Sequence, residues 1–313
     1  MRPFPRAGTW YAAGAWVLTA ATSSCTSLPQ APDLSDRPTP GIPTNAWDED
    51  LAGKRILDSI GEARTGTDVV LWYPKDSLSD AQATEIVARL DKGIVAAKRI
   101  IGKPDWNVQD DRRVHFYCLP GNFISHAPGG NCAFIPVWRM QQDQSPWLHE
   151  AMHLLLKTDK GDWLQQEDSV AMRRMPLWLS EGMADALAMD ISEQEHLIYY
   201  SPLIDVPPAA TDSLALVVLR DAPSDSVLAY IGARGKLPQL WGPDRFSYAL
   251  PFYTGSASFT RYIAKHHGYA PLLKANDAFN QEIDVLEREL AVPMDSVKAR
   301  WLAAIGYSDQ PHH

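Results

Sequence analysis

The chain has 313 residues, a formal net charge of −9 and 45% apolar residues, enough for one large domain or two modest ones with a sizeable core. Nucleic-acid binding needs a basic face that neutralises phosphates. The sequence has neither a basic run nor a glycine-rich phosphate loop, so nucleic acid is excluded as an expected partner.

Residues 1–25 have the pattern of an export signal. Two arginines precede an apolar stretch at about residues 10–22, and two serines and Cys25 follow it. Such a stretch is typical of a secretory signal and is too short and too interrupted to predict a membrane span. A cysteine directly after small residues is similar to a bacterial lipoprotein signal, in which Cys25 becomes the lipidated first residue. The alternative is an ordinary signal peptide that is cleaved nearby.

Residues 26–46 are dense in Pro, Ser and Asp and show no apolar periodicity. This composition predicts a tether between the signal and the folded domain, which we expect to span residues 47–313. A tether behind a lipid anchor lifts a domain off a membrane. The sequence therefore predicts an exported protein of the periplasm or cell envelope, held at the membrane as a lipoprotein.

The folded part is predicted to begin with strands and one helix and to continue as helices. Strands are expected at residues 68–73, 113–119 and 132–138, with a Gly- and Pro-rich loop between the last two. Helices are expected at residues 80–101, 146–157, 176–189 and 251–266, with two or three shorter ones after them. Strands first and helices afterwards indicate an α+β fold.

The segment His149-Glu150-Ala151-Met152-His153 lies on the predicted helix that follows Ser145 and Pro146. His149 and His153 are four residues apart and project from one face, so both imidazoles can reach one metal ion. Glu150 lies about 100° around the helix from His149, where its carboxylate can approach a water molecule on the metal. This pattern can also arise by chance, but its neighbours are apolar, and a buried helix rarely carries three polar residues without a use.

A second apolar segment, at residues 176–188, places Glu181 and Asp185 four residues apart on one helix face. A carboxylate can supply the third ligand of a zinc ion and leave the fourth position for water. Asp185 can then accept the free ring N–H of a ligating histidine and select its tautomer. Gly182 allows another backbone to come close. The alternative is that both carboxylates form a solvated stripe on a surface helix.

The motif H-E-x-x-H at residues 149–153, followed by W-L-S-E-G-x-A-D at residues 178–185, resembles the gluzincin metallopeptidases and in particular the bacterial peptidase MA-like family. The resemblance covers roughly residues 68–303 and implies a zincin-like fold.

The resemblance also implies a role for each motif residue. His149, His153 and Glu181 would hold one Zn²⁺, Glu150 would activate the attacking water, and Asp185 would support a ligating histidine. The implied activity is hydrolysis of peptide bonds in a peptide or protein substrate. The alternatives are a catalytically idle zinc-containing binding or scaffold lipoprotein, and an amidase acting on peptidoglycan peptides. The presence of Glu150 favours an enzyme.

Such peptidases often place a Tyr or His opposite the base, where it donates to the oxyanion. The candidates are Tyr253, Tyr248 and His126. Tyr253 comes first because it begins the segment 253–268 that resembles the helix closing such domains. The alternative is a core tyrosine whose hydroxyl has another partner.

If Cys25 is acylated, Cys118 and Cys132 remain as a pair in an oxidising compartment, which predicts a disulfide. The alternative is two unpaired, buried thiols. The bridge would clamp the loop that carries His126. In gluzincins an edge strand above the zinc helix pairs with extended substrate, so the bridge is expected to anchor the upper wall of the substrate cleft or, alternatively, to staple a loop remote from it.

Overall fold

The structure is a computed structural model that describes residues 46–102, 113–123, 125–129, 131–157, 176–201, 207–221, 224–234, 240, 245–278 and 281–307. The chain divides into Met1–Thr44 and a compact unit, Asn45–His313. The predicted export signal with Cys25, and the predicted tether up to residue 45, lie outside the described residues. Within the described ranges, no helix has both the length and the apolar character needed to cross a membrane.

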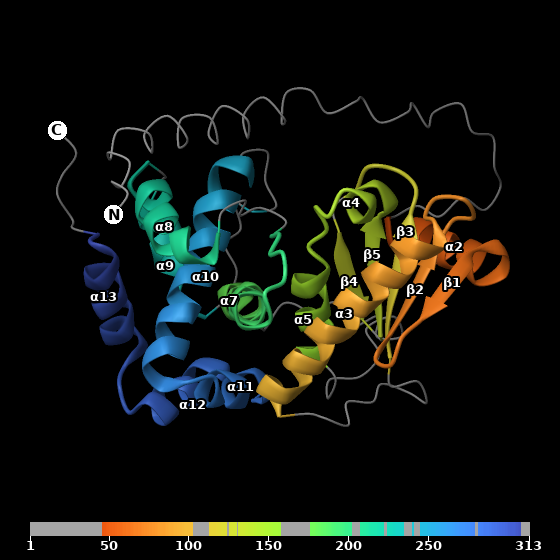
Figure 1. Ribbon diagram of the computed structural model, residues 1–313. Coiled ribbons are helices and arrows are strands. Elements are labelled where there is room, and N and C mark those ends of the chain that lie inside the picture. Colours follow the sequence, from red (N-terminus) through yellow and green to blue (C-terminus); the bar gives the residue numbers. More distant parts are fainter. Residues whose placement is uncertain are drawn as a thin grey trace, which may run out of the picture. The chain divides into compact units, whose positions relative to one another are not determined.

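The described elements are mostly helices beside one small mixed sheet, so the predicted α+β class is confirmed (Figure 1). The strands are β1 (Glu62–Thr65), β2 (Val69–Tyr73), β3 (Val114–Leu119), β4 (His126–Gly129) and β5 (Cys132–Pro136). The helices are α2 (Ala46–Ile60), α3 (Asp80–Ile101), α4 (Val137–Gln141), α5 (Trp147–Lys157), α7 (Leu177–Glu195), the 3₁₀ turn η3 (Pro208–Ala210), α8 (Thr211–Asp221), α9 (Ser224–Tyr230), α10 (Arg245–His267), α11 (Ala270–Asp277), α12 (Glu282–Leu290) and α13 (Met294–Ile305).

The sheet has the strand order β1-β2-β3-β5-β4. Strands β2, β3 and β5 are parallel, and β1 and β4 run antiparallel to them at the two edges. Phe116 and Ile135 face the main core, which also contains the apolar sides of α3, α5 and α7. Tyr117 and Phe134 face the other way and pack with Leu57 of α2. Because side chains alternate along a strand, the two faces are covered by different helices.

Helix α3 has the boundaries that its sequence predicts. Ser79 and Gln82 form a capping box at its start, and Gly102 ends it in the left-handed conformation, with φ 76°. Its apolar residues recur at helical spacing and are buried against the sheet and α5. Local signals therefore determine both ends of this helix and the face that it buries.

Other boundaries differ from the prediction. Helix α2, strand β1 and edge strand β4 were not expected, and the strand predicted at residues 132–138 ends at Pro136, where α4 begins. Helix α7 continues six residues past the predicted end, and α10 begins six residues before Pro251. A proline inside a helix removes one hydrogen bond and crowds the preceding turn. Helix α10 nevertheless continues through Pro251, and it packs against α7 and α8.

The predicted disulfide between Cys118 and Cys132 is wrong, because both are buried free thiols. The prediction required the end of one strand to lie beside the start of the next. In the parallel pairing of β3 with β5, Cys118 lies opposite Ile135 and Cys132 lies opposite His115. The two cysteines are thus three residues, about 10 Å, out of register and point to opposite faces of the sheet, whereas a disulfide needs Cα atoms within about 7 Å. The bridge therefore cannot form a wall of a cleft, and β5 is not an edge strand, because β4 lies beyond it at that edge of the sheet.

Candidate metal centre

Helix α5 is buried on all sides between the sheet, α3 and α7. At its start, Trp147 lies against Gly93 of α3, where an added Cβ would come within 2.5 Å of the indole ring. Near its end, the Asn276 side chain of α11 donates a 2.7 Å hydrogen bond to the Leu156 carbonyl oxygen, which has no helical partner at a helix end. The start of α5 is thus packed on α3 through its own Trp147 ring, and its end is held by a side chain of α11.

Helix α7 lies between α5 and α10 (Figure 1). A Cβ added at Gly182 would lie 2.6 Å from the Ser256 carbonyl oxygen of α10, so the missing side chain allows the two helices to approach closely. Glu181, the preceding residue, has its carboxylate beside the two histidines of α5. Glu181 therefore lies directly beside the residue at which α7 packs closely on α10.

The three predicted ligands come together. His149 Nε2 lies 3.0 Å from His153 Nε2, and Glu181 Oε2 lies 3.5 Å from the first nitrogen and 3.2 Å from the second. Both histidines are buried, and the Glu181 side chain is 17% exposed. The ligand atoms all lie within 4.8 Å of one another, so this group can hold a metal ion.

Asp185 supports one of these ligands. Its Oδ1 lies 2.8 Å from His149 Nδ1. A carboxylate can only accept, so this contact assigns the proton of the neutral imidazole to Nδ1 and leaves the Nε2 lone pair directed at the ligand cluster. His153 Nδ1 is buried and has no hydrogen-bond partner among the described residues. The solvated-stripe alternative for Asp185 is wrong, because this residue is 1% exposed.

The charges of the cluster favour a cation. Burial, the largest influence, lowers the pKa of His149, but the neighbouring carboxylates, Asp185 first, outweigh it and hold that pKa well above its ordinary value. Burial raises the pKa of Glu181, but the two histidines outweigh it and hold that pKa well below its usual range. The carboxylates that stabilise an imidazolium here would equally stabilise a divalent ion, which must displace that proton to bind.

Glu150 is not one of the three ligand residues and lies beside them, 2% exposed. Its own burial, reinforced by the charge of Glu181, raises its pKa, although the histidines oppose this effect. A carboxylate with a raised pKa is a better proton acceptor than one in water. The geometry therefore provides a base next to the cluster.

The three candidate oxyanion donors differ in their surroundings. Tyr253 of α10 is half-buried, and its pKa is raised by burial and then by the charges of Glu181, Asp185 and Glu150, which lie near it. His126 of β4 packs against Phe123 and Phe134, and its charge acts on Glu150.

Tyr248 packs against the main core near the start of α10, and within the described part of the chain no contact joins it to the cluster. Tyr253 of α10 and His126 of β4 therefore remain the candidates.

Two residues of this site were not predicted. The Tyr199 hydroxyl donates to Asp185 Oδ1 at 2.9 Å, and the Ser201 hydroxyl donates to the same oxygen at 3.2 Å. Both lie in the irregular segment after α7. Neither belongs to a motif or a periodic pattern, so no signal in the sequence identifies them.

No protein-family model matches this chain, and no curated protein matches it. The interpretation of the site therefore depends on its own residues and their geometry.

Proposed function

We propose that this protein is a zinc-dependent peptidase of the gluzincin type, with a zincin-like fold, that hydrolyses peptide bonds with a metal-activated water. The observation that carries the proposal is the convergence of His149, His153 and Glu181, with Glu150 beside them and outside the ligand set. Three protein ligands leave one position of a tetrahedral site open, as in catalytic zinc sites.

The donor set fits zinc. Ligand atoms about 2.0–2.2 Å from a tetrahedral zinc ion lie roughly 3.3–3.6 Å from one another. The three distances between ligand atoms here are 3.0, 3.2 and 3.5 Å. Two imidazoles and one carboxylate suit Zn²⁺ better than Mg²⁺ or Ca²⁺, which prefer oxygen ligands.

His149, His153 and Glu181 would hold the zinc ion, which when bound would supply a coordinated water with a pKa of about 7 and a positive charge near the substrate carbonyl. Glu150 accepts the proton of the attacking water and delivers it to the leaving amine. The Asp185 carboxylate keeps His149 in the tautomer that ligates through Nε2. Tyr253, or alternatively His126, donates to the carbonyl oxygen on which negative charge develops.

Two alternatives use the same residues. A binding or scaffold domain that retains the metal without catalysis has no need for Glu150, which is nevertheless present and buried beside the ligands. An amidase acting on peptidoglycan peptides would employ the same base and metal on a different amide. Peptide hydrolysis is the function that we propose.

Digestion of an unbiased peptide library by the purified, zinc-loaded full chain tests the proposal. Glu150→Gln should retain zinc and lose about 10²–10⁴-fold in rate, because it removes the proton acceptor and no ligand. Glu193→Gln, an exposed substitution on α7, is the matched control and should cleave like the wild type. Equal rates in wild type and Glu150→Gln would overturn the mechanism. Zinc binding without any cleavage would favour the scaffold, and cleavage of peptidoglycan peptides alone would favour the amidase.

We also propose that the protein is exported and anchored to a membrane by a lipid on Cys25, on the basis of the N-terminal sequence. Metabolic labelling with a fatty-acid analogue should mark the wild type and not Cys25→Ser. A mature N-terminus elsewhere, without label, would show a secreted protein that lacks the anchor.

A further inference from the structure

The segment Leu197–Ser201 leaves the end of α7 and folds back over the site. His196 has a left-handed backbone, with φ 53°, and the Leu197 N–H donates to the Ser192 carbonyl oxygen at 2.9 Å. This conformation reverses the chain direction at the helix end. We call residues 197–201 the strap.

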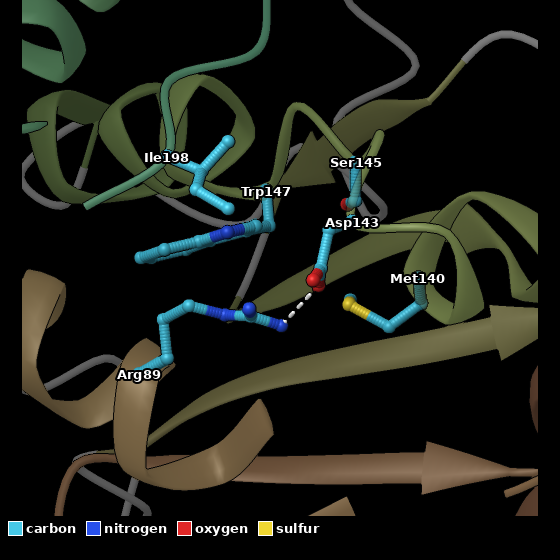
Figure 2. Close-up of a pocket in the computed structure, with 6 residues that line it drawn as sticks. All are labelled: Arg89, Met140, Asp143, Ser145, Trp147 and Ile198. Atoms are coloured by element: carbon cyan, nitrogen blue, oxygen red, sulfur yellow. Dashed lines mark ion pairs between the residues drawn. The ribbon is translucent and has the colours of Figure 1, made fainter. Parts of the chain in front are cut away.

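The strap is attached to the start of α5 and to α4. Figure 2 shows Ile198 and Arg89 on opposite sides of the Trp147 ring, in a small pocket that Met140, Asp143 and Ser145 also line. Arg89 is held there by an ion pair with Asp143, at 2.5 Å. The Tyr200 ring lies 6.0 Å from the Arg139 guanidinium of α4. None of the three proposed metal ligands lines this pocket, and Ile198 contributes to it beside Trp147 at the N-terminal end of α5.

The two remaining polar residues of the strap act on Asp185. Tyr199 and Ser201 donate to Oδ1, the oxygen that also accepts from His149 Nδ1. Asp185 is 1% exposed, so hydrogen-bond donors of the protein take the place of water at its buried carboxylate. Three donors thus converge on one oxygen, and two of them come from the strap.

We propose that Tyr199, assisted by Ser201, is a positioning residue for the metal centre: it orients Asp185, which in turn orients His149. The inference rests on one part of the proposed function, namely that His149 binds a metal ion. Removing the carboxylate that supports a ligating histidine typically weakens metal affinity by about 10–100-fold. Tyr199 is one bond further out, so we expect the lower part of that range.

The experiment compares full-length Tyr199→Phe with Tyr200→Phe, which removes a hydroxyl from the neighbouring residue of the same strap. Zinc affinity is measured by competition with a chelator, and the ligand geometry by the visible absorption of the Co²⁺-substituted protein. Tyr199→Phe should weaken zinc binding about 10-fold and alter the cobalt spectrum. Tyr200→Phe should leave both unchanged.

A purely structural role for Tyr199 predicts a lower melting temperature with unchanged affinity and spectrum, and that result would overturn the inference. If Tyr199→Phe does not fold, Ser201→Ala removes a donor from the same oxygen without removing a ring. It should change affinity in the same direction by less, and unchanged binding in this variant would also overturn the inference.

These measurements need no substrate. Weakened zinc binding in Tyr199→Phe, in a protein that cleaves no peptide, supports the positioning role and contradicts the proposed hydrolysis. Peptide cleavage by the wild type, together with unchanged binding in both strap variants, contradicts the positioning role alone. If the wild-type chain binds no zinc, the proposed metal centre itself is wrong.

Discussion

Two pairs of elements each carry residues that the sequence predicts to meet. One is the pair of helices α5 and α7, and the other is the pair of strands β3 and β5. On the helices, His149 and His153 meet Glu181 within 3.5 Å. On the strands, Cys118 and Cys132 are out of register and on opposite faces. Residues four apart on a helix share a face whatever surrounds the helix, whereas the neighbours of a strand residue depend on which strands pair and in which direction.

The expected effect is largest for Glu181→Ala, which tests whether the two helices form one site. The histidines alone supply two ligands, and a stable zinc site needs at least three. Zinc content after purification without chelator should fall from close to one ion per chain to nearly none. Glu193→Ala, an exposed substitution on the same helix, should keep the metal. Full zinc content in Glu181→Ala would show that the meeting of α5 and α7 is not a metal site.

A smaller effect is expected at Gly182, where α7 touches the backbone of α10. An alanine Cβ would lie 2.6 Å from the Ser256 carbonyl oxygen, so the helices must separate at a cost of roughly 1–3 kcal/mol in the free energy of unfolding. Gly255→Ala is the control, because its Cβ meets the Ile231 methyl at 2.7 Å, and a side-chain end can move. In both variants, replacing glycine by alanine within a helix adds about 1 kcal/mol to the free energy of unfolding through helix propensity.

Denaturant unfolding should therefore show a net loss of up to about 2 kcal/mol for Gly182→Ala, together with weaker zinc binding, and no loss for Gly255→Ala. Equal stability of the two variants would mean that the close approach of α7 to α10 does not determine the position of Glu181.

The smallest effect is expected at the cysteines, where alkylation at pH 8 should leave the folded protein unmodified at Cys118. Burial raises the pKa of this thiol to about 12, so its thiolate fraction at pH 8 is on the order of 10⁻⁴, and the thiolate is the reactive form. After unfolding in guanidinium without a reducing agent, Cys118 and Cys132 should both be alkylated. If peptide mapping finds Cys118 and Cys132 joined, the predicted disulfide exists, and the strands bring their predicted partners together as the helices do.

Where structure depends on neighbours along the chain, the sequence determined it. The ends of α3 follow from the Ser79 capping box and Gly102, and the shared face of His149 and His153 follows from their spacing. The α+β class follows from the change of periodicity along the chain. That Glu181 would join the histidines was implied by a family resemblance, and its geometry required the packing of α7 beside α5.

Tertiary structure alone decided the rest. Parallel pairing of β3 with β5, with β4 between them in the chain and at the sheet edge, separated the cysteines. The strap brought Tyr199 and Ser201 to Asp185 from an irregular segment without a periodic pattern. Helical spacing is an intrinsic property of one segment, whereas strand order and the path of a strap are set by the free energy of the whole packed chain.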